Sequence, residues 1–157
     1  MDIQKFDNIG QIYIVSAPSG AGKTSLVKSV CESNISIRPS VSYTTRKKRD
    51  SEIEGKDYFF ISEREFREKI NNGEFLEYQN VYGNLYGTSI DYTLEIVNKG
   101  YDAILEIDYK GMLMVKKILP QSVSIYILPP NIETLKKRLD LRGQDKSKTV
   151  DLRMESS

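Results

Sequence analysis

The sequence predicts an α/β fold in which a mostly parallel sheet carries helices on both faces. Short apolar, β-rich runs alternate along the chain with amphipathic helical patterns, which is the element order typical of this fold. A length of 157 residues suits one domain with a modest core. Ligands of such sheets bind at the carboxyl ends of the strands, so the residues that follow each strand are the first candidates for a site.

The first expected strand, at 12–15, leads into the loop SAPSGAGKT at 16–24 and then into a helix that ends near Glu32. This strand–loop–helix context predicts a P-loop, whose backbone N–H groups and helix N-terminus bind phosphate. Lys23 would reach the β- and γ-phosphates of a nucleotide. The Thr24 hydroxyl would bind Mg²⁺.

The loop departs from the strict pattern G-x-x-x-x-G-K-[ST] at its first glycine, which is Ala17 here. A methyl group is small, so we expect Ala17 to be tolerated if this position needs no positive φ. Gly20 and Gly22 remain to let the backbone turn tightly. The alternative is an ordinary glycine-rich turn with an exposed lysine, which the flanking strand and helix make the weaker interpretation.

The middle of the chain, from about 40 to 90, is rich in β-like runs and turns. We predict that it forms an insertion over the carboxyl edge of the sheet. Ser62 with Glu65 forms a capping box for a helix that Gly73 ends. Short strands are expected around this helix at 40–43, 58–61, 75–78 and 81–86, with a turn at 83–84.

The second half of the chain returns to the alternating pattern. Thr88 with Asp91 resembles a helix start, and Gly100 ends that helix. The elements expected after it are a strand at 103–107, a helix ending near Pro120, a strand at 123–128 and a helix capped by Asn131.

Two acidic residues, Glu106 and Asp108, alternate at the end of the 103–107 run. We expect them to face the same side of one strand, at the edge where the P-loop also lies. Carboxylates at the end of an apolar strand are rarely structural filler, because burying them unpaired costs too much free energy. They are candidates for orienting Mg²⁺-bound water and the acceptor of a phosphoryl group.

Composition narrows the class of protein. The net charge of +1 creates no global field that would call for nucleic acid or a membrane as partner, and no apolar run approaches the ~20 residues of a membrane span. The N-terminus is polar, without a signal-peptide core. Cys31 is the single cysteine, which excludes an internal disulfide and predicts a reducing, cytoplasmic compartment. The absence of histidine excludes His general bases, Ser-His triads and His-ligated zinc.

Six motifs in order then resemble the guanylate kinase family over about 11 to 153: SAPSGAGKT, SVSYTTRKKRDSEIEGKDYFF, GEFLEY, GNLYGTS, LEIDYKG and ILPPNIETLKKRL. The resemblance implies a P-loop kinase that transfers the γ-phosphate of ATP to GMP, with Mg²⁺ as cofactor and ATP and GMP as its small-molecule partners. It favours neither a monomer nor a homo-oligomer.

The resemblance also implies the roles of individual residues. Catalytic roles fall on Lys23, Arg46, Arg138, Arg142 and Arg153. ATP binding falls on Ala17, Pro18, Ser19, Gly20, Ala21, Gly22, Lys23 and Thr24. GMP binding falls on Ser42, Arg46, Arg49, Tyr58, Glu77, Tyr86, Thr88 and Asp108. Metal binding falls on Thr24, with Glu106 and Asp108 acting through water.

Physical chemistry supports these assignments. An arginine fork binds phosphate through two hydrogen bonds, whereas a run of basic residues such as 46–49 taken alone would be read as a solvated turn. A buried Glu77 carboxylate would accept from N1–H and the 2-amino group of guanine. Adenine offers neither donor, so AMP would leave that carboxylate unpaired.

The resemblance implies one domain over 1–157, with a P-loop core at 1–39 and 92–137, a small mixed α+β GMP-binding insertion at 40–91 and a short lid at 138–157. Family members continue beyond this point, so we expect a shortened form that lacks the closing core elements. The 123–128 strand would then be an exposed edge.

Three alternatives stay open at this point. The chain could be a guanylate-kinase-like module that has lost catalysis and binds phosphopeptides, which retained Lys23 and Thr24 disfavour. It could be another monophosphate kinase, which Glu77 disfavours. It could also be a shortened enzyme that binds GMP but turns over slowly.

Overall fold

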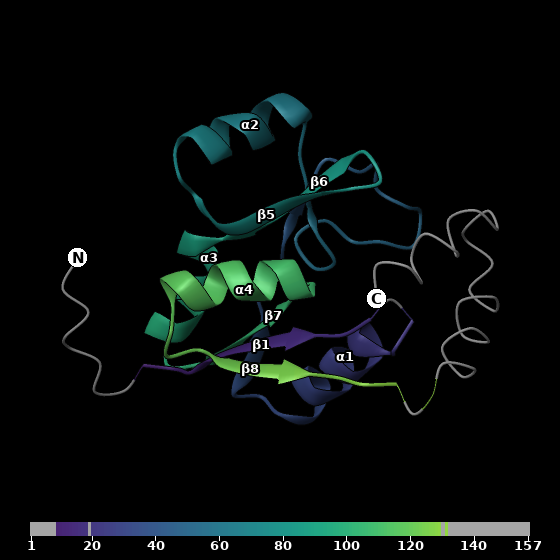
Figure 1. The fold of residues 1–157 in the computed structure, drawn as a ribbon. Helices are drawn as coiled ribbons and strands as arrows, with labels where there is room; N and C mark the ends of the chain where they lie inside the picture. The colour runs from purple at the N-terminus through teal and green to yellow at the C-terminus, as the bar shows by residue number, and fades with distance from the viewer. Residues whose placement is uncertain (1–8, 19, 130, 132–157) are drawn as a thin grey trace.

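The computed structural model describes residues 9–18, 20–129 and 131, and Figure 1 traces their path. Four strands form the parallel sheet that the alternating pattern predicts. In spatial order they are β2 (Ile37–Pro39), β7 (Asp102–Glu106), β1 (Ile12–Ser16) and β8 (Val123–Tyr126). Each neighbouring pair runs parallel. The P-loop and the residues after β7 therefore leave the sheet at the same edge, on adjacent strands.

Helices cover both faces of this sheet, as the sequence predicts. On one face α3 (Ile90–Asn98) and α4 (Tyr109–Ile118) pack against Ile14 and Leu105, which are fully buried. On the other face α1 (Lys23–Ser33) packs through Val27 against Val15 and Ile104. Because side chains alternate along a strand, adjacent residues of β1 and β7 supply the two cores. Figure 1 shows α1 and α4 on opposite sides of β1 and β8.

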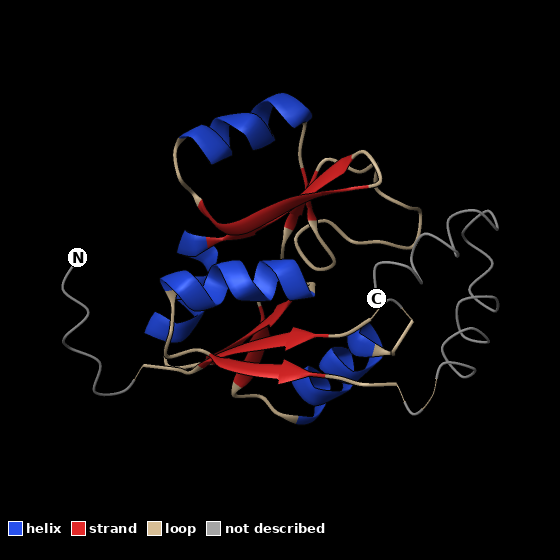
Figure 2. Ribbon diagram, viewed as in Figure 1, coloured by secondary structure: helices blue, strands red, loops and turns tan. Residues whose placement is uncertain are grey.

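The insertion forms a second, mixed sheet with its own helix. Its strands are ordered β4 (Phe59–Phe60), β3 (Tyr43–Thr44), β6 (Asn84–Ser89) and β5 (Phe75–Val81), and α2 (Glu63–Asn71) covers it. Ser62 and Glu65 form the predicted capping box. In Figure 2 α4 lies between the two sheets, so the N-terminal end of this helix faces residues from both.

Three local predictions were wrong in their details. Of the strand expected at 40–43, residues 40–42 form the link between β2 and β3 and Tyr43 begins β3, because Ser40 leaves the first sheet after donating its N–H to the Ile104 carbonyl at 2.8 Å. The hairpin turn is Tyr82-Gly83, one residue earlier than expected, with φ of 51° and 82° as a type I′ turn requires. Helix α3 is capped by Ser89, since Thr88 pairs with Glu77 inside the second sheet.

The described part of β8 is the edge strand of the parallel sheet, as expected. Its side chains are exposed, with Val123 at 41% and Ile125 at 44%. Among the helices that the structure describes, none has the length and apolar character needed to cross a membrane.

Candidate functional site

The P-loop forms the first part of the site, at the carboxyl end of β1. Gly20 and Gly22 have φ of 86° and 93°, which a side chain would strain, so both glycines are required by the backbone. Among non-glycine residues in the described ranges only Tyr82 has a positive φ. Ala17 therefore needs no positive φ, which is the condition under which alanine can replace the first glycine of the motif. Gly22 is the N-cap of α1, and the helix N-terminus contributes a partial positive charge at the loop. Ser19 lies outside the described residues.

Lys23 links the P-loop to the end of β7. Its Nζ donates to the Ile107 carbonyl at 2.9 Å. Burial lowers the pKa of the Lys23 amine, while the negative charges of Glu106, Asp108 and Glu77 act in the opposite direction. The Lys23 amine thus lies in the electrostatic field of carboxylates that come from both sheets.

Thr24 and Glu106 meet at the same edge, where the Thr24 hydroxyl donates to the Glu106 carboxylate. A hydroxyl and a carboxylate are hard oxygen donors of the kind that Mg²⁺ prefers. Within the described ranges no cluster of three or more His, Cys, Asp or Glu could hold a metal by itself. Mg²⁺ commonly uses only one or two carboxylates together with substrate phosphates, so this donor set fits it.

Asp108 lies at the start of α4 instead of in the strand. The β7 strand ends at Glu106, and Asp108 is the N-cap of α4, where its Oδ1 accepts from the Gly111 N–H at 2.8 Å. The expectation that Asp108 and Glu106 alternate along one strand was therefore wrong. Both carboxylates nevertheless act on the charge of Lys23.

Glu77 brings the second sheet into the site. It lies on β5, is 5% exposed, and accepts from the hydroxyl of Thr88 on β6 at 2.6 Å. Burial raises the pKa of Glu77 to about 7, with the hydrogen bond from Thr88 opposing the rise and the charge of Asp108 adding to it. This carboxyl group is therefore close to half ionised at neutral pH.

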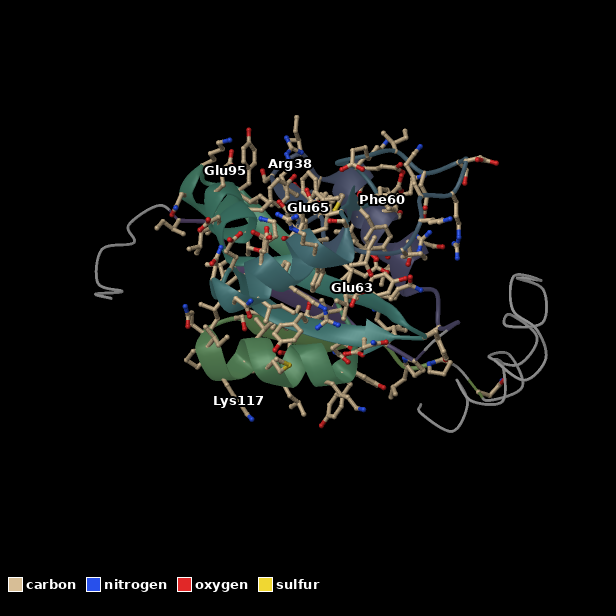
Figure 3. All side chains as sticks on the ribbon, turned by 90° about the horizontal axis from the view of Figure 1, so that it is seen from above. Arg38, Phe60, Glu63, Glu65, Glu95 and Lys117 are labelled. Atoms are coloured by element: carbon tan, nitrogen blue, oxygen red, sulfur yellow. The ribbon has the colours of Figure 1, made fainter. Side chains whose placement is uncertain are left out.

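An arginine and two tyrosines form a further group. Arg46 makes a bidentate ion pair with Glu52 at 2.6 and 3.1 Å, and the two side chains are only 16% and 13% exposed. The guanidinium lies 5.5 Å from the Tyr58 ring, which meets Tyr86 edge-on at 5.8 Å. The ring of Phe60, which Figure 3 labels, lies 5.7 Å from the same guanidinium and meets the Tyr58 ring edge-on at 5.8 Å.

This group lies within electrostatic reach of the acidic edge of the parallel sheet. Burial raises the pKa of Tyr58 to about 12, and the negative charge of Glu106 adds to the rise. The arginine group of the second sheet and the acidic edge of the parallel sheet are thus electrostatically coupled.

Other predicted residues are less central or fall outside the description. Ser42 is half-buried in the link before β3, and its carbonyl accepts from Phe59 N–H at 2.9 Å. Arg49 is exposed, and its backbone N–H donates to the Glu52 carboxylate at 2.8 Å. The lid at 138–157, with Arg138, Arg142 and Arg153, lies outside the described residues.

Sequence reasoning missed three residues of this site. Glu52 pairs with Arg46, the Gln79 amide donates to the Asp108 carboxylate, and Gly111 lies against the Glu77 carboxylate. Glu52 lies within the charged stretch that contains Arg46, which is a weak signal. The position of Gln79 is also a weak signal, because Gln79 stands two residues after Glu77 and therefore lies on the same face of β5 as Glu77.

Comparisons with known proteins agree with this geometry. The family model for guanylate kinase matches residues 9–157. The chain is 48% identical to a guanylate kinase from Pseudomonas fluorescens over 145 residues, which are 92% of this chain and 70% of that protein. It is 50% identical to one from Thiobacillus denitrificans, covering 92% and 69%.

A solved structure gives the same result in three dimensions. The crystal structure of guanylate kinase from Anaplasma phagocytophilum superimposes with a TM-score of 0.69 at 36% identity. The match covers 87% of this chain and 69% of that one. The superposition therefore includes most of the chain.

Proposed function

The chain belongs to the guanylate kinase family, whose reaction transfers the γ-phosphate of ATP to GMP, and we propose how its residues divide that reaction between them. The P-loop binds the ATP phosphates, and the insertion at 40–91 binds GMP. The observation that carries this division is the position of Lys23, whose Nζ donates to the Ile107 carbonyl at 2.9 Å, beside Asp108, which Gln79 of the insertion also contacts.

On the donor side, Lys23 binds the transferring phosphoryl group. The backbone N–H groups of the loop and the N-terminus of α1 hold the other phosphates. Charge that develops on the phosphoryl oxygens meets a cation already fixed by the Ile107 carbonyl, so little reorganisation is needed during transfer. The lid arginines Arg138, Arg142 and Arg153 complete this side by neutralising phosphate charge.

On the acceptor side, Glu77 reads the guanine base. Its carboxylate accepts from N1–H and the 2-amino group, while Thr88 and Asp108 make further base contacts. Arg46 and Arg49, with Ser42, Tyr58 and Tyr86, bind the GMP phosphate. The buried setting of Glu77 supports this role, because a poorly matched base leaves the carboxylate without partners in a dry site.

Mg²⁺ is the proposed cofactor. When bound with the nucleotide, it would neutralise negative charge that builds up during transfer. The Thr24 hydroxyl would hold it, and Glu106 and Asp108 would orient its water ligands, which the Thr24–Glu106 contact supports. The single Cys31 fits a reducing compartment and supports a cytoplasmic location.

A substrate comparison tests the function. Purified protein should form ADP from ATP and Mg²⁺ when GMP is supplied, and far less when AMP is supplied. A coupled ADP assay measures both rates. Equal turnover of the two nucleotides, or none of either, would contradict the proposal. A phosphopeptide-binding module, the alternative from another class, should in addition fail to bind labelled ATP.

Replacing Arg46 by lysine should weaken the binding of GMP more than the binding of ATP. A lysine keeps the charge but loses the planar fork, and with it one charge-assisted hydrogen bond to phosphate. We expect KM for GMP to rise about ten- to a hundredfold, as such bonds contribute roughly 1.5–3 kcal/mol. Steady-state kinetics measures this, with Lys48→Arg on the exposed part of the same stretch as control. An equal rise in KM for ATP would contradict it.

A further inference from the structure

The Gln79 side chain lies between two carboxylates of the candidate site. Its Nε2 donates to Asp108 Oδ1, and its nearness to the Glu77 carboxyl group acts to lower the pKa of that group, against the larger effect of burial. A Cβ built on Gly111 would lie 2.8 Å from Glu77 Oε2 and 3.3 Å from Gln79 Nε2, so both groups pack onto the first turn of α4. Gln79 thus connects β5 to a residue 29 positions further along the chain.

Hydrogen bonds from Gln79 and its neighbours fix one oxygen of each carboxylate and leave acceptor capacity on the other. Asp108 Oδ1 receives the Gly111 N–H at 2.8 Å and the Gln79 amide, and Glu77 Oε1 receives the Thr88 hydroxyl at 2.6 Å. A carboxylate has about four lone-pair sites, so each group can still accept from a ligand. The hydrogen bonds therefore set the orientation in which these two groups would meet a base.

An amide is well suited to this position. Two like charges close together repel, and a lysine between them would form ion pairs that compete with the ligand. The two N–H donors of a neutral glutamine can hold both carboxylates without adding charge. The side chain is half-buried, so its hydrogen bonds are less exposed to competition from water than those of a surface residue.

We propose that Gln79 is a positioning residue for guanine recognition, which ties Glu77 on β5 to Asp108 at the start of α4. This inference rests on the proposed function, because it assumes that Glu77 reads the base. It adds a residue to the specificity of the site, and it gives the second sheet a polar attachment to the edge where the P-loop lies.

The test compares Gln79→Leu and Gln79→Glu with the unchanged protein. Leucine keeps much of the volume and removes both donors, whereas glutamate keeps the shape and adds a third negative charge. We expect KM for GMP to rise about tenfold in Gln79→Leu, for the loss of one or two net hydrogen bonds, and further in Gln79→Glu. KM for ATP and kcat should change less than about threefold.

A base-specific readout separates positioning from general packing. IMP lacks the 2-amino group, so a well-placed Glu77 should favour GMP over IMP, and this preference should fall in both variants. Tyr78→Phe, on the opposite face of β5, serves as the matched control and should leave both substrates unchanged. Melting temperatures of all variants report on folding.

Each outcome decides the matter. A KM for GMP within twofold of the unchanged protein overturns the proposal, as does an equal loss toward GMP, IMP and ATP, which indicates a structural role. If Gln79→Leu does not fold, the isosteric Gln79→Glu gives the result. If the unchanged protein fails to phosphorylate GMP, the proposed function is wrong. If it phosphorylates GMP and the two Gln79 variants do so equally well, the inference about Gln79 alone is wrong.

Discussion

Replacing Lys23 by alanine is expected to abolish phosphoryl transfer and to spare GMP binding. The amine is the P-loop cation nearest the acidic edge, with Nζ 2.9 Å from the Ile107 carbonyl. The substitution removes this positive charge from the place where negative charge develops on the phosphoryl oxygens. Removing one preorganised donor of this kind costs about 10²–10³-fold in kcat, and a formal charge costs more. We expect kcat to fall by at least about 10³-fold.

The measurement pairs an ADP assay with calorimetric titration of GMP. GMP should bind Lys23→Ala with an affinity within about threefold of the unchanged protein, since the acceptor contacts come from the second sheet. Lys117→Ala is the control, because Lys117 is exposed on α4 and points away from the molecule in Figure 3. A kcat within tenfold of normal would show that Lys23 does not serve the transferring group.

The substitution also changes the charge balance of the site. Glu106, Asp108 and Glu77 would lose a nearby cation, so their mutual repulsion would be less compensated. Lys23→Met keeps much of the apolar stem and should fold at least as well as Lys23→Ala. Loss of activity in both variants, with melting temperatures near normal, would assign the effect to the missing charge.

Much of the fold follows from the sequence for a clear physical reason. Strands buried on both faces by helices must be apolar along most of their length, so β1 and β7 stand out as short continuous apolar runs. The capping box at Ser62 and Glu65 and the positive φ of Gly73 and Gly100 are local requirements that neighbouring residues reveal. Such features depend on only a few adjacent positions.

The remaining differences depend on partners far away in the chain. The segment from β2 to β3 has the pattern of a short strand at 40–43 in the sequence, yet it passes from one sheet to the other, and only the pairing of β2 with β7 and of β3 with β6 reveals this. Gln79 reaches Asp108 across 29 positions and could not be found by local pattern. Lys23, Glu77, Glu106 and Asp108 do come together, while their roles in catalysis stay predictions.

Replacing Glu77 by glutamine is expected to weaken GMP binding and to reduce the preference of the enzyme for GMP over AMP. The amide keeps the shape of the side chain but offers a donor where the carboxylate accepts two, so one guanine N–H faces another N–H. A buried mismatch of this kind costs about 10²–10⁴-fold in discrimination. The ratio of kcat/KM values for GMP and AMP measures the change. Glu74→Gln is the control, because Glu74 is a half-buried acid just before β5 whose carboxylate pairs with Lys69 instead of entering the site. An unchanged ratio would show that another group reads the base.

The pH dependence of GMP binding gives a sharper test of the same group. Because burial raises the pKa of Glu77 to about 7, the carboxylate fraction should rise from about a tenth at pH 6 to about nine tenths at pH 8. If GMP requires the carboxylate, its affinity should rise about tenfold over this interval through Glu77 alone. The phosphate of GMP also titrates, near pH ~6. Glu77→Gln retains that titration, so the difference between the two profiles isolates Glu77.

The same shift predicts the opposite trend for stability. The folded protein holds the Glu77 proton more tightly than the unfolded chain, whose carboxyl group titrates near 4.5. The free energy of unfolding should therefore be highest below that value and fall as pH rises through about 7, where the buried group ionises. Glu77→Gln should lack this component, so its melting temperature should fall less than that of the unchanged protein between pH 5 and 8. Parallel melting profiles would mean that Glu77 ionises near its ordinary pKa, and the tighter GMP binding expected at high pH would then have another origin.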